Sequence, residues 1–155
     1  MKKINWKRLI IIIIITFIVG SFFSFFTMNN MDTFKELKKP INVPGVLFPV
    51  VWSILYLLMS ISCYIITTKD DKNKDNAIIW YGIQLVINSL WSLIFFGFSA
   101  YLFSFIWIIL LLTIVIIMIV KFYKIDKMAS YLNIPYVLWI LFAGFLNLGI
   151  YILNR

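Results

Sequence analysis

Residues 81–98 read YGIQLVINSLWSLIFFGF, a stretch that is apolar except for a few small polar groups and two primary amides, Gln84 and Asn88. Its length and apolar content are typical of a helix that crosses a membrane. A buried amide without a hydrogen-bond partner costs roughly 2–7 kcal/mol, depending on the reference medium. Gln84 and Asn88 therefore need partners on neighbouring helices or on a bound molecule.

The composition of the whole chain also indicates a membrane protein. Of its 155 residues, 63% are hydrophobic and 13% are charged, whereas soluble domains average about 45–50% apolar and about 25% charged residues. The net charge of +8 comes from Lys and Arg residues that lie almost entirely between apolar runs, as membrane-flanking charge does. We therefore predict a lipid bilayer and no nucleic acid as the partner of this chain.

Five apolar segments have the roughly 20 residues that a helix needs to cross a hydrocarbon core of about 30 Å. The first follows a basic start, but its apolar run is too long for a signal peptide and no A-x-A-like cleavage site follows it. We predict a single all-α membrane domain, residues 1–155, built as a five-helix transmembrane bundle. The spans are predicted at residues 9–28, 46–67, 77–97, 100–120 and 132–153.

The distribution of basic residues predicts the orientation of this bundle. Ten Lys and Arg residues lie in the N-terminal segment and in the second and fourth loops. Four lie on the other side, in residues 29–45 and at Arg155. Cytoplasmic loops carry an excess of Lys and Arg. We therefore predict a multi-pass protein of a bacterial cytoplasmic membrane, with its N-terminus in the cytoplasm and the 29–45 loop outside.

Polar and aromatic side chains gather on one face of three predicted spans. At 100° per residue, Gln84, Asn88 and Trp91 fall within a stripe of about 80°. The corresponding faces of the second and fifth spans carry Trp52, Tyr56, Met59, Cys63, Tyr136, Trp139, Ala143 and Asn147. Turned inward, these faces predict a small-molecule pocket with aromatic walls. The alternative is that the amides form hydrogen bonds between helices, each stabilising the bundle by about 0.6–2 kcal/mol. The residues alone do not decide between a pocket and such contacts.

The residue types disfavour ordinary catalysis and metal binding. The chain has no histidine and a single cysteine, Cys63, which excludes a His-based triad, a disulfide within the chain and a cysteine metal cluster. All six carboxylates lie outside the predicted spans, so proton- or ion-coupled transport also lacks an ionisable group within the membrane. We predict no metal and no obligatory cofactor.

The first span carries small residues at every fourth position, Thr16, Gly20 and Ser24. Small residues at this spacing permit close approach of two helices. This face predicts a homodimer contact or, equally, packing within the same bundle.

Three segments resemble the TspO/MBR family, also known as translocator or tryptophan-rich sensory proteins. They are FPVVWSILYLLMSISCYI (48–65), QLVINSLWSLIFFG (84–97) and IPYVLWILFAGFLN (134–147). The resemblance extends from the 29–45 loop to the C-terminus. It implies a five-helix membrane bundle with a ligand pocket that is covered by the loop between the first two helices.

The resemblance also implies a function and a set of site residues. It implies a receptor or carrier for porphyrins such as protoporphyrin IX, for sterols, or for synthetic isoquinoline and benzodiazepine compounds. A further implied activity is light-dependent porphyrin degradation with Trp52 and Trp139 as the photochemical residues. Carried over by position, the ligand-binding residues are Trp52, Gln84, Asn88, Trp91, Trp139, Phe142, Ala143 and Leu146, and the shared face of the second span adds Tyr56. The implied lid residues are Phe34, Lys39, Pro40 and Pro44, with Thr33-Phe34 where the family usually carries Trp-Tyr.

Residues 148–155 contain a weaker signal. Leu148, Tyr151 and Arg155 fit a loose sterol-binding pattern of Leu or Val, then Tyr, then Lys or Arg. The simpler interpretation is an anchor at the membrane–water interface, where tyrosine and basic residues are common.

Overall fold

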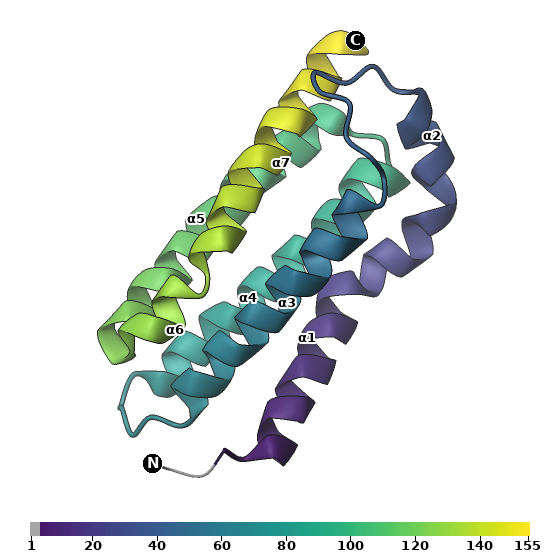
Figure 1. Ribbon diagram of the computed structural model, residues 1–155. Helices are drawn as coiled ribbons and strands as arrows, with labels where there is room; N and C mark the ends of the chain where they lie inside the picture. Colours follow the sequence, from purple (N-terminus) through teal and green to yellow (C-terminus); the bar gives the residue numbers. More distant parts are fainter. Residues whose placement is uncertain (1–3) are drawn as a thin grey trace.

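The computed structural model describes residues 4–155, and helices are the only regular elements in that range. Figure 1 shows an elongated bundle whose long helices run along a common direction. The long helices are α1 (Trp6–Thr27), α3 (Leu47–Thr67), α4 (Lys74–Ser92, continued by the π-helical turn η2, Leu93–Gly97), α5 (Tyr101–Ile125) and α7 (Ile134–Leu153). The short ones are η1 (Met28–Asn30), α2 (Met31–Glu36) and α6 (Lys127–Tyr131). Five segments are long and apolar enough to cross a membrane, which confirms the predicted fold class.

The structure differs from the predicted spans in several places, and the first and third long helices begin three residues earlier than predicted, at Trp6 and Lys74. Part of the 29–45 loop is helical, as α2, and the fourth span continues past residue 120 to Ile125. Asp126 caps α6, its Oδ1 accepting from the Ala129 N–H at 2.9 Å, and α6 ends at Tyr131, just before the predicted fifth span. A new helix, α7, then begins with Pro135 in its first turn, where a missing N–H costs no hydrogen bond.

The helices pack in a defined order. Helix α1 lies against α3 and α4, α4 lies against α5, and α5 lies against α7. The short turn between η2 and α5 reverses the chain through Ser99, whose φ of 51° is left-handed. Helices α3 and α7 meet mainly through aromatic rings, because Trp52 lies 6.1 Å from Tyr136 and 6.4 Å from Trp139 between ring centroids.

The small-residue face of α1 is used inside the bundle. Thr16 and Gly20 are fully buried, and a Cβ at Gly20 would lie 2.7 Å from the ring of Tyr56. Three hydrogen bonds join this face to α3 and α4: Thr16 Oγ1 with Tyr81 OH at 2.6 Å, Tyr56 OH to Gly20 O at 2.8 Å, and Ser24 Oγ with Ser92 Oγ at 2.8 Å. Of the two interpretations of this face, the structure shows packing within one bundle. The homodimer stays a prediction, and this face is not available for it.

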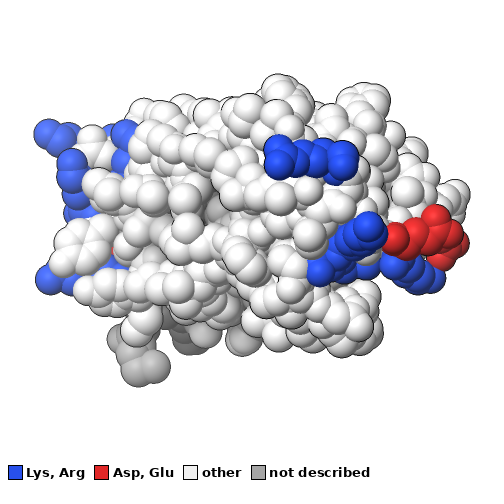
Figure 2. All heavy atoms as spheres, turned by 90° about the horizontal axis from the view of Figure 1, so that it is seen from above, with Lys and Arg blue, Asp and Glu red and all other residues white. Residues whose placement is uncertain are grey.

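Charged side chains gather toward the two ends of the bundle, with a broad uncharged surface between them (Figure 2). The start of α1, the α3–α4 loop and the α5–α6 junction lie at the same end (Figure 1), as the count of basic residues assumed. Lys2 and Lys3 belong to that count but lie outside the described residues. Which end faces the cytoplasm stays a prediction.

Candidate functional site

Gln84 is held by neighbouring helices. Its side chain is fully buried. Tyr136 OH on α7 donates to Gln84 Oε1 at 2.9 Å, and Gln84 Nε2 lies 3.6 Å from Met59 Sδ on α3. One of the two amides of 81–98 is therefore a bridge between helices.

Asn147 is the centre of a second buried network. Its Oδ1 accepts from Trp91 Nε1 at 3.2 Å and from Ser104 Oγ at 2.9 Å, and its Nδ2 donates to the Tyr101 carbonyl at 2.7 Å. These bonds join α4, α5 and α7. Sequence reasoning placed Asn147 and Trp91 on inward faces but missed Ser104, because a single serine in a mostly apolar span gives no signal by itself.

Asn88 and Trp139 differ from these two residues because each keeps a polar atom without a partner. Asn88 Nδ2 donates to Tyr56 OH at 3.2 Å, but Asn88 Oδ1 has no hydrogen-bond partner, and neither has Trp139 Nε1. Both atoms are buried, and unpaired buried polar atoms are rare in folded proteins. The two residues also line the same void, together with Trp52, Trp91 and Ala143. The two residues that carry an unpaired acceptor and an unpaired donor thus line one space.

The predicted hollow between the three polar faces is closed in this structure. The void beside Asn88 and Trp139 has a volume of only about 10 Å³. A second void, lined by Phe34, Trp91, Ala143, Leu146 and their neighbours, is equally small. The space between α3 and α7 is instead occupied by the protein's own rings, including Tyr136, which is fully buried, and Trp139, which lies 5.9 Å from the ring of Phe48.

A larger cavity, of about 490 Å³, lies between α1 and α3. Of the predicted ligand-binding residues, it includes Trp52, Tyr56 and Trp91. The other lining residues come from α1, η1, the start of α3 with the loop before it, α4 and η2, namely Phe17, Ser21, Ser24, Phe25, Thr27, Met28, Gly45, Phe48, Pro49, Ser53, Ser92 and Phe96. Trp52 and Trp91 line both this cavity and the closed void, so the two spaces are neighbours. The α1 residues were not predicted as ligand-binding residues, because the small-residue face of the first span was interpreted only as a helix contact and the rest of the span is mostly apolar.

The loop between α1 and α3 crosses the end of the bundle toward α7 (Figure 1). Phe34 on α2 is buried among the rings of Phe48, Phe95 and Phe96, at centroid distances of 5.6, 6.1 and 5.7 Å. Lys39 Nζ lies 4.5 Å from the centre of the Phe34 ring, within the range of a cation–π contact. Phe34 therefore packs at the end of the bundle, and its role in covering a ligand stays a prediction.

The same loop is attached to the end of α7. Pro40 packs against Gly149 so closely that a Cβ on Gly149 would lie 2.3 Å from the Pro40 ring. Asn154 fastens the loop by accepting from the Lys38 N–H at 3.0 Å and donating to the Lys38 carbonyl at 2.8 Å. Pro44, the fourth predicted lid residue, accepts from the Leu47 N–H at 3.0 Å at the start of α3. Gly149 and Asn154 were not predicted, because their role depends on a loop more than 100 residues away in sequence.

The side chains around these spaces are aromatic, aliphatic or neutral and polar. Among the described residues, no three His, Cys, Asp or Glu side chains form a group that could hold a metal ion. The site has indole, hydroxyl and carboxamide groups with which to contact a ligand, and it has no ionisable pair that would suit acid–base chemistry.

Comparison with known proteins identifies the family. The sequence matches the model of the TspO/MBR family over residues 11–153. It is 38% identical over 152 residues to the tryptophan-rich protein TspO of Archaeoglobus fulgidus, covering 97% of this chain and 99% of that one. It is 36% identical to protein CrtK of Rhodobacter capsulatus, covering 78% of each chain, and 29% identical to the uncharacterized membrane protein YtaB of Bacillus subtilis, covering 99% of each. Five membrane-spanning helices and a family match over nearly the whole chain lead to one conclusion: this multi-pass integral membrane protein belongs to the TspO/MBR family.

Proposed function

We propose that this protein is a membrane receptor or carrier for a planar, mostly apolar ligand of the porphyrin class, and that the ligand occupies the cavity between α1 and α3. The observation that carries the proposal is the cavity of about 490 Å³ beside Trp52, Tyr56 and Trp91. This volume lies within the roughly 300–1,000 Å³ of typical small-molecule sites, which combine apolar walls with a few polar groups.

The arrangement of the rings supports a flat ligand. Trp52 and Tyr56 lie 5.4 Å apart with their planes tilted by 31°, so both contribute to one wall of the cavity. Aromatic pairs add about 0.5–1.5 kcal/mol beyond the burial of apolar area. A free-base porphyrin fits this chain better than haem does, because the chain has no histidine to coordinate iron.

The unpaired atoms beyond Trp52 supply the polar contacts of the proposed complex. A rotation of the Trp52 indole would join the cavity to the void that Asn88 and Trp139 line. Trp139 Nε1 would then donate to an acceptor on the ligand, and Asn88 Oδ1 would accept from a donor. Binding would thus satisfy two buried atoms that have no partner in the free protein.

Titration of the detergent-solubilised protein with protoporphyrin IX tests this proposal. Trp52→Ala should weaken binding by about tenfold, which corresponds to about 1.4 kcal/mol. Trp6→Ala is the matched control, because Trp6 is exposed at the start of α1 and should keep wild-type affinity. Trp139→Phe keeps a ring but removes the unpaired N–H and should also weaken binding. Unchanged affinity in both Trp52→Ala and Trp139→Phe would overturn the proposal, and competition by a sterol would identify the alternative ligand class.

A second candidate function is light-dependent oxidation of the bound porphyrin by dioxygen. It is supported by the 6.4 Å separation of the Trp52 and Trp139 rings, which places two indole electron donors in series next to the cavity. Trp52→Phe and Trp139→Phe should slow bleaching of bound protoporphyrin under illumination when compared at equal occupancy. Equal bleaching in the variants and the wild type would exclude a role of these indoles.

A further inference from the structure

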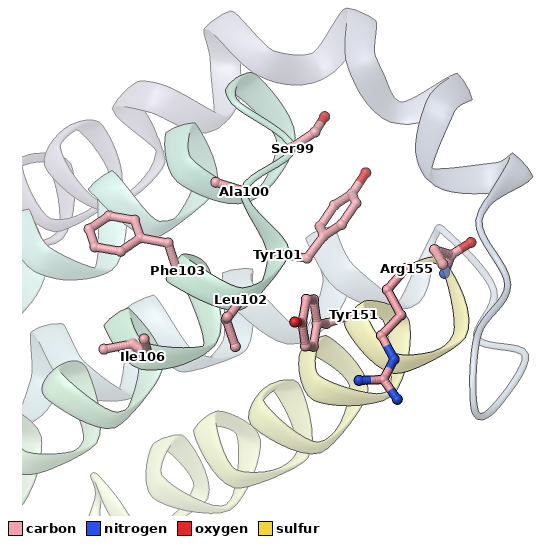
Figure 3. Close-up of a pocket in the computed structure, with 9 residues that line it drawn as sticks. Ser99, Ala100, Tyr101, Leu102, Phe103, Ile106, Tyr151 and Arg155 are labelled. Atoms are coloured by element: carbon pink, nitrogen blue, oxygen red, sulfur yellow. The ribbon is translucent and has the colours of Figure 1, made fainter.

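A second hollow lies away from the proposed ligand cavity, at the end of the bundle where α5 begins and α7 ends. This groove has a volume of about 650 Å³. Figure 3 shows side chains from the two helices facing each other across it. Its lining residues are Ser99, Ala100, Tyr101, Leu102, Phe103, Ile106, Tyr151, Asn154 and Arg155. None of them belongs to the cavity between α1 and α3.

The groove changes character along its length. Leu102, Phe103 and Ile106 are exposed apolar side chains in the first turns of α5, and they belong to a helix long enough to cross a membrane. Arg155 lies at the opposite limit of the groove, beyond the end of α7. Tyr151 lies on the last turns of α7, and tyrosine is enriched where hydrocarbon meets headgroups. The groove therefore extends from acyl-chain depth to headgroup depth.

The rim of the groove carries the guanidinium group of Arg155. Arg155 is the charged side chain among the lining residues, and none of these residues carries a carboxylate side chain. Arg155 takes part in neither of the ion pairs found among the described residues. The backbone of Lys38 is hydrogen-bonded to the side chain of Asn154, which lines the groove. The guanidinium group is well suited to phosphate, which it binds with two parallel hydrogen bonds.

We propose that this groove binds an anionic phospholipid. One acyl chain lies along Leu102, Phe103 and Ile106, and the phosphate is bound by the Arg155 guanidinium, with Tyr151 at the level of the glycerol backbone. Charge complementarity favours this occupant over a neutral lipid, and the apolar floor favours it over a free anion. The site is independent of the ligand proposed for the α1–α3 cavity.

Native mass spectrometry of lipid binding to the delipidated protein, in a neutral detergent, tests this proposal. The lipids compared are phosphatidylglycerol and phosphatidylcholine with identical acyl chains. The wild type should retain about fivefold more phosphatidylglycerol, the preference expected from one basic residue at the lipid surface. Arg155→Ala should abolish this preference, and Arg155→Lys should keep part of it. Lys124→Ala is the matched control, because Lys124 lies in the last turn of α5 at the opposite end of the bundle, and it should behave as the wild type.

Three further measurements complete the test. Ile106→Trp, which fills the apolar floor, should reduce retention of both lipids, as expected if the acyl chain lies there. Inorganic phosphate, and separately a sterol, should not displace phosphatidylglycerol at concentrations equal to that of the lipid. Equal retention of the two lipids by the wild type, an undiminished preference in Arg155→Ala, or displacement by phosphate or sterol would each overturn the proposal.

Discussion

Replacing Asn147 by leucine should destabilise the bundle far more than the same replacement at Asn88. Asn147 makes three hydrogen bonds, which join α4, α5 and α7 at distances between 2.7 and 3.2 Å. Asn88 makes one, at 3.2 Å, and its Oδ1 is unpaired. Both side chains are almost fully buried, at 1% and 2% exposure. Leucine has the same branching at Cγ and the same number of side-chain heavy atoms as asparagine, and it replaces asparagine at both positions, so the difference between the two variants reports on hydrogen bonding.

The expected loss of unfolding free energy follows from these hydrogen bonds. Hydrogen bonds between membrane helices are worth about 0.6–2 kcal/mol each. Leucine at 147 also leaves Trp91 Nε1 without its acceptor, whereas Ser104 Oγ keeps the Tyr101 carbonyl as a partner at 2.9 Å. The expected loss of unfolding free energy is about 2–4 kcal/mol. At Asn88 the loss of one long bond is offset by removal of an unpaired oxygen, so the change should stay within about 1 kcal/mol.

Reversible unfolding in mixed micelles with increasing sodium dodecyl sulfate, followed by circular dichroism, measures both values. Asn147→Leu should unfold at a lower fraction of dodecyl sulfate, and Asn88→Leu should remain near the wild type. In the porphyrin titration, Asn88→Leu should weaken binding although its fold is stable. Equal destabilisation by the two substitutions would refute the division into a structural amide and an amide kept for the ligand.

Two further predictions concern the ends of the bundle. Gly149→Ala should release the lid loop, because a Cβ would lie 2.3 Å from Pro40. Amide hydrogen exchange over residues 37–46 should then become faster. Gly82→Ala is the control, because its Cβ meets nothing within 4 Å, and it should leave the exchange rate of these residues unchanged. Asp126→Asn should lower the unfolding free energy by about 0.5–1 kcal/mol at neutral pH, because asparagine keeps the helix cap but loses the 2.5 Å ion pair with Lys69. Although partial burial raises the pKa of Asp126, hydrogen bonds from Lys69 and the Ala129 N–H lower it overall from its ordinary value of 3.8. The stability contributed by the Asp126–Lys69 pair is thus complete above pH 3.8 and is lost as the pH falls through the lower pKa of the folded state. If Asp126→Asn were still less stable than the wild type in acid, the ion pair would not be the cause.

The membrane fold was predictable from the sequence because crossing a bilayer depends on local properties. An apolar run of about 20 residues satisfies the length and the hydrophobicity of a span whatever the other spans do. The predicted fourth span ended too early because a long apolar helix can extend beyond the hydrocarbon, and α5 does so as far as Ile125. Helical periodicity also identified the buried face of α4 correctly, since Gln84, Asn88 and Trp91 are all buried.

Periodicity could not identify partners, because it describes one helix at a time. Gln84 and Asn88 lie one turn apart on the same face, yet the oxygen of Gln84 receives the Tyr136 hydroxyl and the oxygen of Asn88 receives nothing. The same limit applies to the small-residue face of α1, where the spacing fits a second copy and the parent bundle equally well. The tertiary structure decided in favour of the parent bundle through the hydroxyls of Tyr56 and Tyr81.

The number of spans, their approximate limits and the family were thus contained in the sequence, since each depends on residues that are consecutive or regularly spaced along the chain. The position of open space was decided by the tertiary structure alone. The ring of Tyr136 fills the gap between α3 and α7, and the main cavity lies beside α1. Both outcomes depend on the volumes of side chains that come from separate helices and meet at one place. No single segment of the chain carries that information.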